Sequence, residues 1–163
     1  MNKKIILPVV VLLTVLVGGF ALFKGKPKTP GPTPTPIEEP IVQLSPDQFP
    51  QISLDFSSNG HFVTVNITNL HASALEYNLV YEAVVKKTKI QTGVSASTKL
   101  DGATTYSKEQ LLGSESSGKF TYHTDIQNGQ LELTLRDSAG RSIYTANYPF
   151  THSPGKSVDL TAS

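Results

Sequence analysis

From Gln51 onward, apolar residues recur at every second position, and turn residues interrupt them at intervals of about ten residues. No stretch in this part of the chain shows sustained helical spacing. Because helices cannot then cover the faces of a sheet, two sheets must cover each other. The sequence therefore predicts an all-β domain, an antiparallel β-sandwich built by residues 51–150.

Seven or eight strands are predicted in this domain. The strongest alternation runs from Leu75 to Val85, with Tyr77 and Tyr81 on the apolar side, and predicts a long central strand. The weaker pattern in residues 89–98 predicts a short edge strand, and the pattern in residues 108–112 predicts either a strand or a helical turn. The other predicted strands are residues 51–57, 62–68, 119–124, 130–136 and 142–150.

The last predicted hairpin resembles part of a known class of domain. It contains Leu131-x-Leu133-x-Leu135, then Asp137-x-x-Gly140, then a strand in which Tyr144, Ala146 and Tyr148 alternate inward. This pattern is similar to the last hairpin of many bacterial extracellular immunoglobulin-like modules. The resemblance implies an immunoglobulin-like or fibronectin type III-like sandwich over residues 51–150. The chain departs from antibody domains in having no cysteine and no tryptophan.

An uncharged stretch precedes the domain. Ile5 to Phe23 is nineteen residues long, which at ~1.5 Å per residue spans about 28 Å, close to the thickness of a bilayer core. Lysines flank it on both sides, so charge does not settle its orientation. We expect a short tail over residues 1–4 and a transmembrane signal-anchor helix over 5–23 that partners the lipid bilayer. The alternative is a signal peptide cleaved near Gly18, Gly19 or Ala21.

A proline-rich segment joins the two parts. Eight prolines lie between Lys26 and Gln51, and Thr33-Pro34-Thr35-Pro36 is typical of a semi-rigid polyproline II spacer. We therefore expect a linker over residues 24–50. At the other end, residues 151–163 are predicted to form a flexible C-terminal tail.

The residues that carry chemistry do not cluster in the sequence. No two of the four histidines stand at metal-ligand spacing, and a surface position is expected for each. Asp101, Asp125 and Asp137 lie in turns without a calcium-loop pattern. No Walker A, Rossmann or G-x-S-x-G motif occurs. We predict no enzyme activity, no cofactor, no metal site and no catalytic residue. The histidines are His61, His71, His123 and His152.

The charge and the aromatic residues of the domain limit the classes of partner that it can bind. Residues 49–163 carry nine Lys/Arg against ten Asp/Glu, which gives no field for a nucleic acid. The Lys86, Lys87 and Lys89 cluster could contact an anionic polymer or lipid headgroups, although solvation explains it as well. Five of the six tyrosines, Tyr122 among them, fall on predicted inward positions, so core packing is favoured over a sugar-stacking platform.

Three functional hypotheses follow from these features. The first is a non-catalytic, membrane-anchored binding or scaffolding module of the cell envelope, with the domain outside the cytoplasm and an envelope protein or polysaccharide as partner. The second is a secreted carbohydrate-binding protein released by signal peptide cleavage. The third is an accessory subunit of a membrane complex. The sequence identifies no binding residues.

Overall fold

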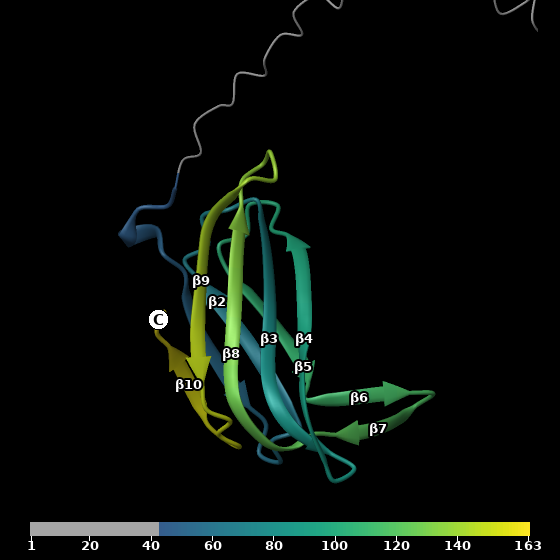
Figure 1. Cartoon of the computed structure of the whole chain (residues 1–163). Coiled ribbons are helices and arrows are strands. Elements are labelled where there is room, and N and C mark those ends of the chain that lie inside the picture. Colours follow the sequence, from purple (N-terminus) through teal and green to yellow (C-terminus); the bar gives the residue numbers. More distant parts are fainter. Residues whose placement is uncertain (1–42) are drawn as a thin grey trace, which may run out of the picture. The chain divides into compact units, whose positions relative to one another are not determined.

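The computed structural model describes residues 43–163, which form an all-β domain of antiparallel strands (Figure 1). Two four-stranded sheets pack face to face, and a separate two-stranded hairpin stands out from them. A single turn of 3₁₀ helix, η1 (Pro46–Gln48), precedes the first strand. The antiparallel β-sandwich predicted from the alternating pattern is confirmed. Eight strands build the two sheets, and the projecting hairpin adds two more.

One sheet, called here the β1–β2 sheet, has the strand order β10-β1-β2-β5. The ambiguous segment at 108–112 belongs to it, and most of that segment is strand β5. The strand bounds are β1 (Gln51–Phe56), β2 (Phe62–Thr68), β5 (Tyr106–Leu111) and β10 (Ser157–Leu160).

Strand β10 corrects the prediction of a flexible tail over residues 151–163. It pairs with β1 in antiparallel register, with Ile52 opposite Leu160 and Leu54 opposite Val158. Val158 and Leu160 also pack against the buried core. An alternating pattern of four residues is too short to predict a strand from the sequence. This segment becomes a strand because it pairs with the edge of β1.

The other sheet, called the β3–β8 sheet, has the strand order β4-β3-β8-β9. The predicted edge strand is β4; it lies at an edge, as expected, but it is long because it pairs with β3 over its full length. Lys86 and Lys87 form the tight turn between them, both with positive φ. The bounds are β3 (Ala74–Val85), β4 (Thr88–Lys99), β8 (Thr124–Arg136) and β9 (Ser142–Phe150).

The core lies between the two sheets and is filled by the alternate residues that the pattern predicts. Leu131, Leu133 and Leu135 of β8 are fully buried, and Tyr77 and Tyr81 of β3 are the largest fully buried side chains. The β1–β2 sheet contributes the facing apolar side chains. These are Ile52, Leu54, Phe56, Val63, Val65 and Ile67.

The end of the predicted linker belongs to the domain. The Leu44 N–H donates to the Ile143 carbonyl, and the Phe49 ring packs on Tyr144 with centroids 5.0 Å apart. The Asn69 amide donates to the carbonyls of Asp47 and Phe49 at 3.0 and 2.9 Å. The boundary expected at residue 50 therefore lies closer to residue 44, because residues 44–49 have partners on the sandwich.

The N-terminal predictions lie outside the described residues. They are the tail over residues 1–4, the membrane helix from Ile5 to Phe23 and the first part of the linker. Within residues 43–163, no helix is long and apolar enough to cross a membrane.

Candidate functional site

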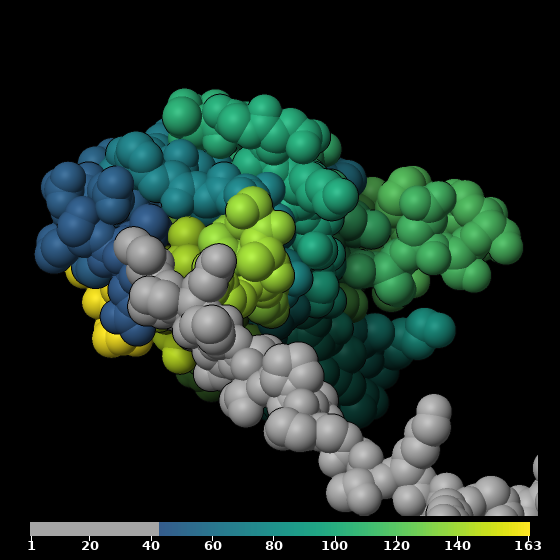
Figure 2. All heavy atoms as spheres, turned by 90° about the horizontal axis from the view of Figure 1, so that it is seen from above, coloured from purple at the N-terminus to yellow at the C-terminus, as the bar shows by residue number. Residues whose placement is uncertain are grey.

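A two-stranded hairpin leaves the sandwich and extends beyond its edge, as Figure 1 and the view in Figure 2 both show. It consists of β6 (Gly113–Ser116) and β7 (Lys119–Tyr122). Ser117 and Gly118 join them with φ values of 51° and 75°, both positive as in a type I′ hairpin turn. We call this hairpin the aromatic arm.

The register of the aromatic arm separates its side chains into two faces. Gly113 pairs with Tyr122 and Glu115 with Phe120, so these four residues share one face. The opposite face carries Ser114, Ser116, Lys119 and Thr121. One side of the arm therefore carries the aromatic rings, and the other side carries only polar serine, threonine and lysine side chains.

The aromatic face is open to solvent. Phe120 is 49% exposed and Tyr122 is 37% exposed. The two rings lie parallel with centroids 6.1 Å apart, and the His61 ring stacks on Tyr122 at 3.7 Å. Phe62 approaches Tyr122 edge-on at 6.4 Å. These two rings of β7 and the half-buried His61 and Phe62, which lie just before and at the start of β2, thus form one aromatic group whose outer members are exposed.

The base of the aromatic arm is held by buried groups. Leu112 is fully buried; its N–H donates to the His61 carbonyl at 2.8 Å, and its carbonyl accepts the His123 N–H at 2.9 Å. The His123 ring is almost fully buried, with Nδ1 lying 2.9 Å from the Tyr81 hydroxyl. The arm is therefore rooted at a defined point between the sheets.

The two titratable groups at this root are both shifted by burial. Burial lowers the pKa of His123 below its ordinary value, because removing the ring from water disfavours the charged form. It raises the pKa of Tyr81 to about 12 for the same reason. Both groups are consequently neutral near pH 7 and share one hydrogen bond.

The histidines do not form a metal site among the described residues. His61 stacks on the aromatic arm, His71 bonds with Asn69, and His152 bonds with the Gly60 carbonyl. His123 corrects the expectation of a surface position, since it is buried against Tyr81. The turn positions of Asp101 and Asp137 agree with the sequence analysis, and Asp137 accepts the Ala139 and Arg141 N–H groups.

The exposed position of Tyr122 corrects a second prediction. Alternation in residues 119–124 indicated that Phe120 and Tyr122 share a side and that Tyr122 points inward. The two rings do share a side, but β7 leaves the sandwich, so no second sheet lies opposite them. Tyr77, Tyr81 and Tyr148 are buried as predicted, and Tyr144 is partly buried against the core.

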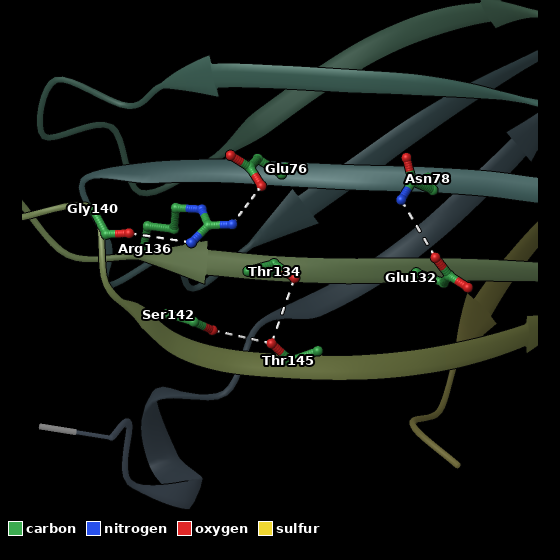
Figure 3. Close-up of polar contacts among 8 residues, drawn as sticks. All are labelled: Glu76, Asn78, Glu132, Thr134, Arg136, Gly140, Ser142 and Thr145. Carbon is green, nitrogen blue, oxygen red and sulfur yellow. Dashed lines mark hydrogen bonds and ion pairs between the residues drawn. The ribbon is translucent and has the colours of Figure 1, made fainter. Parts of the chain in front are cut away.

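The outer surface of the β3–β8 sheet is also polar, and Figure 3 shows contacts among its side chains. Arg136 donates to the Glu76 carboxylate at 2.9 Å and to the Gly140 carbonyl at 3.1 Å. The guanidinium lowers the pKa of the Glu76 carboxyl through this bond. Asn78 donates to Glu132 at 3.4 Å. These groups bond to one another across neighbouring strands, whereas the rings of the aromatic arm are open to a partner.

Comparisons with known proteins do not indicate the role of the aromatic arm or of the domain. No protein-family model matches the chain, and the searches of curated proteins and of solved structures found no match.

Proposed function

We propose that this chain is a non-catalytic binding module of the cell envelope, carried on a single membrane-spanning helix, and that the aromatic arm is its contact with a protein partner. The observation that carries this proposal is the exposure of Phe120 and Tyr122 on a hairpin that contributes nothing to either main sheet. Aromatic side chains are enriched where proteins bind one another, and protruding loops on rigid scaffolds commonly bind partners.

An immunoglobulin-like domain is the scaffold that we propose. In such domains strand B pairs with A and E, and strand C pairs with F, which in turn pairs with G. The same pairings arise here when β1, β2 and β5 take the places of A, B and E, and β3, β8 and β9 those of C, F and G. Strand β4 then corresponds to the additional strand beside C. The aromatic arm lies in the connection between E and F.

The membrane part of the proposal rests on the uncharged residues from Ile5 to Phe23 and the proline-rich segment after them. Together they would hold the domain outside the cytoplasm at a distance from the bilayer. Protease treatment of whole cells tests this topology. Loss of the domain from intact cells supports it, and full protection until the cells are lysed contradicts it.

A protein partner fits the aromatic arm better than a stacked sugar. Sugars bind against an open ring face, and the His61 ring covers one face of Tyr122. The neighbouring Glu115 and the hydroxyl-rich opposite face give the mixture of aromatic and polar groups found in protein interfaces. A polysaccharide is the alternative outcome of the test below.

Site-specific photo-crosslinking of the full chain in its native cells tests the proposed contact. A photoreactive residue at position 120 is expected to give one discrete protein adduct, and the same residue at position 116 of the polar face serves as the matched control. An adduct that Tyr122→Ala abolishes supports the proposal. Equal adducts from both positions, or a purified chain that hydrolyses or transfers a substrate, would contradict it. Retention on envelope polysaccharide that Phe120→Ala abolishes would support the sugar alternative.

A further inference from the structure

The two main sheets end in four edge strands, β4 and β9 on one sheet and β5 and β10 on the other. An edge strand presents a row of unpaired backbone N–H and carbonyl groups, which another chain can use to extend the sheet. Protein sheets protect such edges with charges, prolines, short strands or covering segments. The four edges of this domain differ in how far they are protected.

Three of the edges carry such protection. On β9, the Ile143 carbonyl accepts the Leu44 N–H, the Asn147 carbonyl accepts the Ser163 N–H at 2.9 Å, and Pro149 lacks a donor. On β5, Lys108 and Glu109 place opposite charges on a strand of six residues. Strand β10 has only four residues. Each of these strands therefore offers little uninterrupted backbone to a further strand.

Strand β4 has none of this protection along its centre. It is twelve residues long, and the nine residues from Ile90 to Thr98 contain neither a charge nor a proline. Its residues alternate between exposed and half-buried positions from Gln91 to Lys99. Gly93 keeps β4 close to β3, since a Cβ there would lie 2.3 Å from the Leu79 carbonyl oxygen. The result is an accessible edge strand that is paired along its whole length with β3.

We propose that the free edge of β4 is a docking site for an extended peptide segment of a partner protein, which adds to the β3–β8 sheet as a fifth strand. A whole second sheet fits this edge poorly, because the aromatic arm extends on the β4 side of the sandwich (Figure 1). A single extended segment is only one strand wide and needs only the row of backbone groups. The arm thus permits strand addition while it hinders edge-to-edge association of two copies.

The side chains around β4 indicate the chemistry of that segment. One side of the added strand would continue the row of Ile90, Thr92, Val94, Ala96 and Thr98, which suits β-branched residues such as valine or isoleucine. The other side would continue the row of Gln91 and Ser95, which suits threonine or serine. Lysines lie at both ends of the strand, and β4 itself has no acidic residue. Lys89 is already paired with Glu82 of β3, so the lysines that complement carboxylates at the two ends of the segment are Lys86 and Lys87 in the preceding turn and Lys99 at the far end.

The test uses the full chain in mild detergent and a synthetic peptide of alternating valine and threonine with a glutamate at each end. Hydrogen exchange is expected to slow at every second amide of β4, because successive N–H groups of a strand point to opposite edges. The same peptide with lysines at its ends is expected to bind about tenfold more weakly, since it places like charges beside like charges. Exchange that is unchanged along β4 at a high peptide concentration would overturn the proposal.

A charge variant supplies the second arm of the test. Gln91→Glu combined with Ser95→Glu is expected to weaken binding of the acidic peptide about tenfold, because two added negative charges on the edge strand would repel the glutamates at the ends of the peptide. Thr145→Glu combined with Asn147→Glu adds the same charge on β9, the far edge of this sheet, and is expected to leave binding unchanged. Equal losses in both variants would show that the peptide does not bind at β4. This inference does not depend on the aromatic arm having a partner, so the two proposals fail separately.

Discussion

The aromatic arm and the β8–β9 hairpin are built alike and end in opposite environments. Both are antiparallel pairs, and β7 of the arm, like β8 and β9, carries large apolar or aromatic side chains at every second position. In β8–β9 those side chains face the β1–β2 sheet, and Leu133 and Tyr148 are buried. In the aromatic arm no layer lies opposite, and Phe120 and Tyr122 are exposed. Alternation of apolar residues therefore specifies a strand, whereas burial of its apolar side chains also requires a second layer opposite the strand.

The largest expected effect comes from the buried side of this comparison. Leu133→Ala removes a fully buried side chain and leaves a cavity, which we expect to cost about 2–5 kcal/mol in the free energy of unfolding. Urea unfolding of the full chain in mild detergent, followed by circular dichroism, measures it. A cost as small as that of Phe120→Ala would show that the two hairpins do not differ in this way.

Two glycines test whether the aromatic arm unfolds separately from the sandwich. A Cβ on Gly93 would meet the Leu79 carbonyl oxygen at 2.3 Å, and a Cβ on Gly113 would meet the Thr121 carbonyl oxygen at 2.5 Å. We expect Gly93→Ala to lower the stability of the whole domain by about 1–3 kcal/mol, because both partners are backbone.

The same change in the arm is expected to act locally. Gly113→Ala should speed hydrogen exchange in β6 and β7 while changing the global unfolding midpoint far less than Gly93→Ala does. If the two variants lower the midpoint equally, the arm is part of the cooperative unit of the sandwich.

The root of the arm should make stability depend on pH. Burial holds the pKa of His123 below its ordinary value of 6.5, so the unfolded chain binds more protons than the folded one as the pH falls. The contribution of neutral, buried His123 to the free energy of unfolding is fully present above pH 6.5 and is lost as the pH falls toward the folded-state pKa. Unfolding midpoints of the native chain and of His123→Gln, measured across this range, isolate the effect. Parallel curves for the two proteins would show that His123 does not cause it.

The smallest effect on stability is expected on the aromatic face. Phe120→Ala removes an exposed ring and should change the free energy of unfolding by less than about 0.5 kcal/mol. Its effect on crosslinking to the partner, measured with the photoreactive residue at position 122 instead of 120, should be large. A substantial loss of stability instead would indicate that the ring has a structural role.

The sandwich and most of its core could be predicted from the sequence, because the inward positions of β8 and β3 repeat at a strict period of two. Strand β5 stayed ambiguous because Glu109 and Gln110 favour a helix, and only its pairing with β2 decides the conformation. Tertiary pairing thus settled what local preference left open.

The candidate site could not be predicted in the same way. The contacts that define it join residues far apart in the chain, Tyr81 with His123 and His61 with Tyr122. No local pattern reports such contacts. The sequence also gives no sign that β7 leaves the sheet, since Phe120 and Tyr122 follow the same alternation as buried residues elsewhere.

The pairing of β1 between β2 and β10 has a mechanical consequence. Ile52 lies opposite Leu160, so tension between the segment before β1 and the C-terminus would separate β1 and β10 one residue pair at a time. Phe56 lies at the other end of β1, opposite Val63 and near the root of the arm. Tension between the N-terminal side and a partner gripping the arm would instead load the β1–β2 ladder in shear. All of its residue pairs would then resist together, so the domain is built to bear a pull through its arm better than a pull through its C-terminus.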